Sequence, residues 1–355
     1  MPTPSQPESP STERTAIIGA GLAGLSCARE LGRSGVPVRV FDRGRSAGGR
    51  VSTRRGQGGD QTGPLYDHGA PMIHVRNATV AQIAERWVEQ HAAQWWSPIT
   101  LHPDGSRSQT ERVIVGTPSM SSITQALSVG LDLHNSVTVT DLSHDQQGWL
   151  LRLKHYGSTE ATTERFDRVV LAMPIPQASR IIAPQDPSAL SECPTISYEP
   201  TWACMMTLQV GEDLCTLPDI VDTDDGDRVV FAHRKPGHTL PAGTTALVLH
   251  ANHAWSASYR DASPGEVCSI LGQRALDIMQ NQIGVLISRP QILDQQAHRW
   301  GLARATNPAC ESHWYCPDRS LGCCSDGFGG SDAESAYLSG IAMARAIVAA
   351  QAHRD

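Results

Sequence analysis

The sequence lacks the features of several protein classes. None of its apolar runs approaches the length of a membrane span, so we expect no transmembrane segment. The net charge is −7, which gives no basic excess for binding nucleic acid, and we expect no nucleic-acid partner. Residues 1–13 are rich in proline and serine and lack the basic and apolar parts of a signal peptide, so they are predicted to be a disordered leader.

A cysteine framework and the signatures of common hydrolases are also missing. The 9 cysteines are odd in number and scattered, which favours reduced thiols in a cytoplasmic protein over a disulfide scaffold. Cys310, Cys316 and the adjacent Cys323-Cys324 are close in sequence, but their spacing matches no zinc-ligand pattern, and we predict no metal. The chain has no Ser-His-Asp signature, so nucleophilic hydrolysis is not favoured.

The most informative segment is a short apolar strand, 15–18, that leads into three glycines. Gly19, Gly21 and Gly24 have the spacing G-x-G-x-x-G, and helical periodicity follows over 22–31. In such a motif the first glycine permits a tight turn, the second lets a pyrophosphate approach the backbone, and the third lets helix and strand pack closely. The free N–H groups at the helix start also favour phosphate. A purely structural glycine-rich turn is the alternative.

A second strand supports the dinucleotide interpretation. Residues 38–41 follow a Gly-Val-Pro turn and end at Asp42, which lies 18 residues after Gly24, where the ribose-binding acid of this motif is expected. The alternative for Asp42 is a solvated turn residue. The sequence therefore predicts a nucleotide-binding βαβ unit near the start of the chain.

The length of 355 residues is enough for two domains. Apolar periodicity predicts helices over 78–91, 264–280 and 331–350, and strands over 136–142, 148–153, 169–172, 202–210 and 244–251. A nucleotide motif at the start and a glycine-rich loop with a helix at the end predict one α/β domain assembled from both chain ends. The predicted boundaries are 14–75, 112–175 and 298–355 for the nucleotide-binding domain, and 76–111 and 176–297 for an inserted substrate domain.

Further segments join the glycine motif. They are RSAGGR at 45–50, DHGA at 67–70, VGTPSM at 115–120, VLAMPIPQ at 170–177, YEPTWA at 198–203, HRW at 298–300, SDGF at 325–328 and AYLSG at 336–340. Together these residues resemble the FAD-dependent amine-oxidase-like flavoproteins, and within them the renalase branch, over residues 14–350. The resemblance implies an α/β fold with a Rossmann-like FAD-binding domain and an inserted sheet-plus-helix substrate domain.

The resemblance also implies roles for individual positions. Asp42 would hold the adenosine ribose, Gly49 and Arg50 would lie along the pyrophosphate and ribityl chain, and Asp326 would bind a ribityl hydroxyl. A surface role for Arg50 and a capping role for Asp326 are the alternatives. No Cys or His has a placement typical of a covalent flavin link, so FAD is expected to be non-covalent. The expected FAD-binding residues are Gly19, Gly21, Leu22, Ala23, Gly24, Asp42, Arg43, Gly49, Arg50, Val139 (through its backbone, to the adenine), Asp326 and Ala336.

The catalytic group would be the flavin itself, and no protein residue is assigned as an acid or base. Trp300 and His298 are the candidate pocket residues, although a core role for Trp300 is the alternative. The helix after Gly330 would point its positive dipole end at the flavin ring, where reduction develops negative charge. Arg234-Lys235 could contact an anionic substrate, but a solvated pair is the favoured interpretation. Three further histidines could transfer protons, but surface or core roles are favoured for them: His74, His233 and His253.

The function implied by the resemblance is hydride transfer from a small-molecule substrate to flavin N5, with O2 as electron acceptor and hydrogen peroxide as product. Its renalase branch implies dihydro-NAD(P) isomers as substrates. No lysine follows Gly237, which disfavours a polyamine oxidase. Ser325, Gly301-Leu302 and Cys323-Cys324 depart from the branch's pattern near the expected ring site. The alternatives are a flavin amine oxidase or desaturase of a secondary metabolite, and a non-catalytic flavin-binding protein.

Overall fold

The fold is described from a computed structural model that defines residues 13–56, 63–182, 184–210, 217–232, 234–283 and 291–352. The predicted leader, apart from Glu13, and the candidate His233 lie outside these residues. Within them, no helix combines the length and apolarity needed to cross a bilayer. The same ranges contain no group of three or more His, Cys, Asp or Glu side chains arranged to hold a metal ion.

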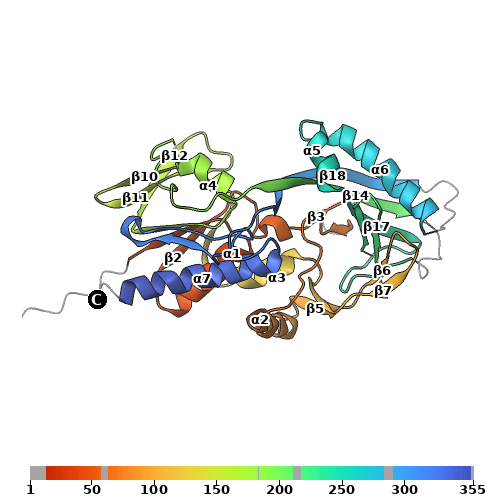
Figure 1. Ribbon diagram of the computed structural model, residues 1–355, viewed down its shortest axis with the longest axis horizontal. Coiled ribbons are helices and arrows are strands. Elements are labelled where there is room, and N and C mark those ends of the chain that lie inside the picture. Colours follow the sequence, from red (N-terminus) through yellow and green to blue (C-terminus); the bar gives the residue numbers. More distant parts are fainter. Residues whose placement is uncertain are drawn as a thin grey trace, which may run out of the picture.

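The first sheet is built from both ends of the chain (Figure 1). Its strand order is β19-β20-β13-β1-β2-β9, and β1 runs parallel to both neighbours, so that Thr15 lies between Arg168 and Val38. Only β19 runs antiparallel to its neighbour in this sheet. The strands are β1 (Thr15–Ile18), β2 (Val38–Phe41), β9 (Asp132–His134), β13 (Arg168–Leu171), β19 (Trp314–Cys316) and β20 (Leu321–Cys323).

Helices α1 (Leu22–Arg33) and α7 (Ala333–Ala352), which come from opposite ends of the chain, pack against each other. A Cβ on Gly340 would meet the carbonyl oxygen of Ala23, so the two backbones are in close approach. Ser26 Oγ donates a hydrogen bond of 2.8 Å to the Tyr337 carbonyl across the same contact. The glycine and serine therefore set the distance between the two helices, and thereby bring the start of α7 close to the glycine motif.

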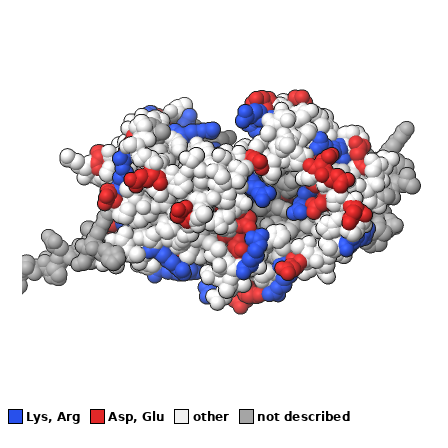
Figure 2. All heavy atoms as spheres, viewed as in Figure 1, with Lys and Arg blue, Asp and Glu red and all other residues white. Residues whose placement is uncertain are grey.

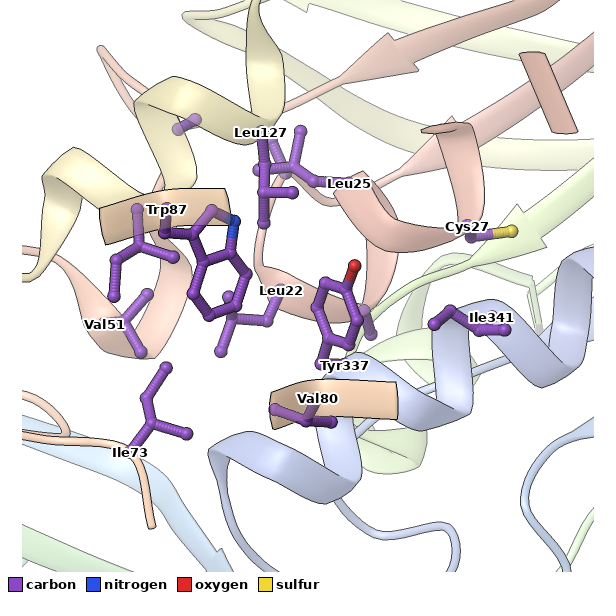
Figure 3. Close-up of a cluster of buried hydrophobic side chains, with 14 of the residues drawn as sticks. Leu22, Leu25, Cys27, Val51, Ile73, Val80, Trp87, Leu127, Tyr337 and Ile341 are labelled. Atoms are coloured by element: carbon purple, nitrogen blue, oxygen red, sulfur yellow. The ribbon is translucent and has the colours of Figure 1, made fainter. Parts of the chain in front are cut away.

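Helix α2 (Ala78–Glu89) belongs to the same core. Its Trp87 ring meets the Tyr337 ring edge to face, with the ring centroids 5.6 Å apart (Figure 3). Nearby lie β5 (Ala93–Trp96), β8 (Val113–Gly116) and α3 (Ser121–Ser128). The predicted substrate domain included 76–111, yet the apolar face of α2 is buried against α1 and α7, because the helix has one apolar stripe and this core covers it.

A three-stranded antiparallel sheet lies beside the first sheet and shares a second core with it. Its strands are β10 (Val137–Asp145), β11 (Gly148–His155) and β12 (Ala161–Phe166), and α4 (Ile175–Ile182) packs on β10. Buried Trp149 and Phe41 both belong to this core, so the end of β2 is held against the small sheet.

The third large unit is a seven-stranded sheet in the order β18-β14-β17-β16-β15-β6-β7. Helices α5 (His253–Ser258) and α6 (Pro264–Asn281) pack on it, and Ser263 caps α6 by accepting the N–H of Glu266. The strands are β6 (Ile99–Leu101), β7 (Arg107–Gln109), β14 (Tyr198–Gln209), β15 (Ile220–Asp222), β16 (Arg228–Phe231), β17 (Thr244–His250) and β18 (Gln291–Ala305).

The long strands β14 and β18 pair along most of their length and run from this sheet toward the first one (Figure 1). β18 is continuous from Gln291 to Ala305, so it crosses the domain boundary predicted at residue 298. Beyond residue 298 the segment has no strict alternation of apolar and polar residues, so the sequence predicts no strand there. The division into two domains stays a prediction, with β18 shared between them.

Candidate functional site

The three glycines of the motif have different surroundings. Gly19 has φ +115°, and a Cβ there would strike the carbonyl oxygen of Ala172. A Cβ on Gly24 would strike the carbonyl oxygen of Gly19, so the protein's own packing requires both glycines. A Cβ on Gly21 would meet no atom within 4 Å, because this position faces open space at the start of α1. That space is the one a pyrophosphate would need to approach the backbone.

The second glycine turn closes over the first. Gly49 has φ +55°, and a Cβ there would lie 3.2 Å from Gly21 Cα. Gly48 N–H donates a hydrogen bond of 3.0 Å to the Ala20 carbonyl. We call Gly19, Gly21, Gly24 and Gly49 the glycine cradle. Leu22 and Ala23 begin α1 directly behind it, where their N–H groups have no acceptor within the helix.

Asp42 is held against the cradle at the end of β2. Its carboxylate accepts the N–H groups of Ala20 and Gly44, each at 2.6 Å. The Asp42 carbonyl accepts the Val137 N–H at 2.9 Å, which places the start of β10, and buried Val139, beside it. Arg43 is exposed next to it. The carboxylate is therefore oriented by two backbone donors, while its remaining lone pairs are available to a ligand.

Arg50 and Asp326 are joined in an ion pair that the sequence did not predict. Arg50 Nη1 lies 2.8 Å from Asp326 Oδ2, and Nη2 donates to the other carboxylate oxygen. Arg50 also donates to the Leu302 carbonyl at 3.1 Å, while the Tyr198 hydroxyl lies 3.4 Å from Asp326 Oδ1. Burial and the charge of Asp326 raise the pKa of Tyr198 to about 12. Both expected FAD contacts thus come together, and they bring β18 and β14 to the cradle.

Ala336 lies in the first turns of α7, next to the α1 contact. Asp332 Oδ1 accepts the Ser335 N–H at 2.9 Å, and Glu334 Oε1 accepts the N–H groups of Arg76 and Asn77, each at 2.8 Å. Two carboxylates therefore occupy the N-terminus of α7, and they offset part of the helix dipole that was expected to face the flavin.

The second part of the site is a group of aromatic side chains, His68, His250, His298 and Trp300, which we call the His–Trp cluster. The His68 and Trp300 rings are stacked with centroids 5.1 Å apart, and the His298 and Trp300 rings meet edge to face at 4.6 Å. The carbonyl of His68 accepts Trp300 Nε1–H at 2.8 Å and His250 Nε2–H at 3.1 Å. The sequence identified His298 and Trp300 as pocket residues, and the structure places them against each other.

The histidines of this cluster are uncharged near neutral pH. Burial, with the nearby His298 and Arg54, lowers the pKa of His68 to about 3. Burial and then Arg54 lower the pKa of His298 to about 4, and burial lowers that of His250 to about 4. Arg54 Nη2 lies 3.4 Å from His298 Nδ1. The cluster therefore offers planar, neutral surfaces instead of positive charge. Single histidines give no sequence signal for such a cluster.

Beneath the cluster, Asp67 forms an ion pair with Lys235, and His238 Nε2 lies 3.5 Å from the same carboxylate oxygen. Lys235 is 3% exposed, so its interpretation as half of a solvated pair was wrong. Its neighbour Arg234 is exposed and pairs with Asp219 at 3.0 Å. The sequence does not distinguish two adjacent basic residues. The turn after β16 leaves Arg234 exposed and buries Lys235.

Of the proton-transfer candidates, the two that the structure describes, His74 and His253, do not join the cluster. His74 is exposed, and burial of part of its ring together with Arg76 lowers its pKa. His253 lies on α5, and its Nδ1 atom is 3.0 Å from Thr201 Oγ1.

A surface hollow of about 430 Å³ borders the cluster along β18. It is lined by Trp202, Arg260, Asp261, Ala262, Pro264, Ala297, His298 and Arg299.

All eight described cysteines are free thiols, and Cys323 and Cys324 are fully buried beside Ser325 and Asp326. Charged side chains of both signs are interspersed over the face shown in Figure 2.

Comparison with known proteins supports the fold. Residues 17–87 match the family model of the NAD(P)-binding Rossmann-like domain. Cyclohexylamine oxidase from Brevibacterium oxydans IH-35A superimposes with a TM-score of 0.67 and 12% identity, over 97% of this chain and 100% of that one. Reduced UDP-galactopyranose mutase gives a TM-score of 0.71 and 10% identity, over 95% of this chain and 96% of that one.

Among sequence relatives, a lysine-specific histone demethylase 1 homolog from rice is 28% identical over 158 residues, which are 40% of this chain and 19% of the relative. The chain spans less than a third of the length of the curated relatives that it matches. The structural neighbours confirm the predicted α/β fold with a Rossmann-like unit, and the proteins named here are an oxidase, a mutase and a demethylase.

Proposed function

We propose that this protein is an FAD-dependent oxidoreductase that binds FAD without a covalent link. The observation that carries the proposal is the open space before Gly21, framed by Gly49 and by the oriented Asp42 carboxylate. Unlike Gly19 and Gly24, Gly21 is not required by the protein's own packing, and it lies at the start of α1, where a pyrophosphate would approach the backbone. FAD would be held by the cradle with Leu22, Ala23, Asp42, Arg43, Arg50, Val139, Asp326 and Ala336.

Bound FAD would supply the hydride-accepting chemistry, and the chain's own residues would position the substrate. The uncharged rings of the His–Trp cluster would form one wall of the substrate site, with His298 edge to face to His68 and Trp300, which stack on each other. Such a wall would exclude water and orient a flat ring by aromatic contact. Arg50 binds both carboxylate oxygens of Asp326 and fixes its position, so Asp326 would bind a ribityl hydroxyl with its remaining lone pairs.

For the substrate we propose a dihydro-NAD(P) isomer, with O2 as the electron acceptor. A dihydronicotinamide is electron-rich, so its oxidation needs no protein base. Arg54 lies beside His298 and has no acidic partner within 4 Å among the residues that the structure describes, so it suits an anionic substrate. A flavin amine oxidase remains the second candidate, favoured by the structural likeness to cyclohexylamine oxidase.

The test begins with the purified protein, which should be yellow and release FAD on acid precipitation. A colourless protein that takes up no added FAD would overturn the cofactor proposal. Anaerobic mixing should then bleach the flavin's visible absorbance faster with 2- or 6-dihydro-NAD(P) than with polyamines or catecholamines. Rapid bleaching by an amine, with dihydronicotinamides inert, would favour the second candidate. A flavin that no reductant bleaches would point to a non-catalytic flavin-binding protein.

A further inference from the structure

Lys235 is an unusual residue in this molecule. The sequence contains only two lysines, and the other, Lys154, is exposed on β11. Lys235 lies in the connection between β16 and β17 of the seven-stranded sheet, where its side chain is 2% exposed. Burying an ammonium group costs free energy unless the group is paired with an opposite charge.

The partner, Asp67, is the meeting point of three parts of the chain. One carboxylate oxygen receives Lys235 Nζ, with His238 Nε2 at 3.5 Å. The other oxygen accepts Thr53 Oγ1–H at 2.5 Å and the Met120 N–H at 2.9 Å. Burial opposes ionisation of Asp67, but the charge of Lys235 and the contacts of His238 prevail and hold its pKa well below its usual range. The carboxylate is therefore ionised and saturated with donors.

The next residue along the chain is His68, whose carbonyl accepts Trp300 Nε1–H and His250 Nε2–H. Asp67 and His68 thus both accept hydrogen bonds from residues of the seven-stranded sheet or its connections. Asp67 takes them through its side chain and His68 through its backbone. A rotation of the 67–68 backbone would break both sets together and would also tilt the imidazole that stacks on Trp300.

We propose that Lys235 is a positioning residue, which acts through Asp67 to fix the His–Trp cluster in the orientation that receives the substrate ring. The proposal rests on the proposed function, because it takes the cluster as the wall of the substrate site. Lys235 itself touches none of the cluster's stacked rings. Its ammonium keeps Asp67 charged and stationary, and this holds the His68 backbone and the rings that bond to it.

The decisive variant is Lys235→Met, with Lys154→Met as the matched control. Loss of the cation leaves a buried carboxylate without its partner, so the pKa of Asp67 rises and the carboxyl rotates or takes up a proton. A misplacement of about 1 Å in a positioned group can cost about 10²-fold in rate. We therefore expect the anaerobic reduction rate at saturating substrate to fall by about 10²-fold in Lys235→Met, with FAD content unchanged and Lys154→Met like the wild type.

The pH profile separates positioning from general instability. Asp67 faces Lys235 and His238 from the β16–β17 connection. It also faces Thr53, just before β3 (Arg54–Arg55), and the Met120 N–H at the start of α3. His250 of β17 lies nearby. None of the other groups supplies a permanent cation. Lys235→Met should therefore show a new ionisation, with the rate changing as Asp67 deprotonates. The double variant Asp67→Asn/Lys235→Met, which buries no charge, should recover at least tenfold of the lost rate and lose that ionisation.

A readout that needs no substrate keeps this inference distinct from the proposed function. Hydrogen exchange of the amides in 66–70 and 298–302 should be faster in Lys235→Met than in the wild type, with exchange in 15–24 unchanged. If dihydronicotinamides fail to reduce the wild type while this exchange pattern appears, the proposed substrate is wrong and the positioning role stands. Wild-type exchange, rate and pH profile in Lys235→Met would overturn the inference, and so would a double variant no better than the single one.

Discussion

The glycine cradle and the His–Trp cluster are constructed in opposite ways. The cradle is made almost entirely of backbone from 19–24 and 48–50, two nearby segments, with Ala172 as its distant contact. The cluster takes His68 from a loop, His250 from the end of β17, and His298 and Trp300 from β18. A region made of local backbone tolerates distant mutations, whereas a region assembled from separate elements depends on the packing between them.

Substitutions at two glycines of the cradle should have different effects. One should lower the unfolding free energy and the other should weaken FAD binding. Gly24→Ala places a Cβ on the Gly19 carbonyl, which the rigid turn cannot avoid, so we expect a loss of about 3 kcal/mol in the free energy of unfolding. Gly21→Ala meets no protein atom, so its unfolding free energy should change by less than about 1 kcal/mol while FAD binding weakens. Urea unfolding of the apoprotein and FAD titration measure the two effects.

Gly32→Ala is the control for this pair, because a Cβ there also meets nothing and the position lies at the far end of α1. It should leave FAD affinity unchanged and raise the unfolding free energy by at most about 1 kcal/mol, because alanine is the better helix former. Equal FAD binding by Gly21→Ala and Gly32→Ala would mean that no phosphate approaches Gly21.

The Arg50–Asp326 pair lies between the cradle and the cluster. Substitutions of its two members should lower the unfolding free energy by different amounts. Asp326 is 4% exposed, so Arg50→Ala leaves a carboxylate buried without its cation, at a cost of about 3 kcal/mol in unfolding free energy. Arg50 is 27% exposed, so in Asp326→Asn it reaches water and the cost should be smaller. Urea unfolding of both apoproteins gives the comparison. If Asp326→Asn were the more damaging change, the buried carboxylate would not be the costly member of the pair.

Acid should weaken the cluster before it affects the cradle. The pKa values of His68 and His250 are about 3 and 4 in the folded protein, below the ordinary value near 6.5. The unfolded chain therefore binds more protons below pH 6.5, so this stability is complete above pH 6.5 and is lost as pH falls toward 4. We expect a loss on the order of 2 kcal/mol for each histidine between pH 6.5 and pH 5.

Thermal unfolding as a function of pH measures this loss. His250→Gln keeps a donor for the His68 carbonyl but cannot titrate, so its pH dependence should be flatter than that of the wild type. His155→Gln, at an exposed position, should leave the pH dependence unchanged. An unaltered slope in His250→Gln would show that His250 does not titrate on unfolding.

Asp42→Ala should weaken FAD binding. A ribose carboxylate makes one or two charge-assisted hydrogen bonds of roughly 1.5–3 kcal/mol each, so FAD affinity should fall by about 10- to 100-fold. Part of any loss will come from the Ala20 and Gly44 amides that lose their acceptor. FAD titration of Asp42→Asn, which keeps an acceptor but no charge, separates these contributions, and an unchanged affinity in Asp42→Ala would reduce Asp42 to a turn residue.

The sequence by itself determined the cradle, because a G-x-G-x-x-G turn between a strand and a helix has few backbone solutions, and Gly19, Gly24 and Asp42 lie where that geometry requires them. It also indicated α7, β14 and β17 through their apolar periodicity. Only the tertiary structure decided which of Arg234 and Lys235 is buried, that Arg50 meets Asp326, and that His68 stacks on Trp300. These contacts join residues up to 276 positions apart, and no local pattern records such a meeting, since it depends on how two sheets are placed against each other.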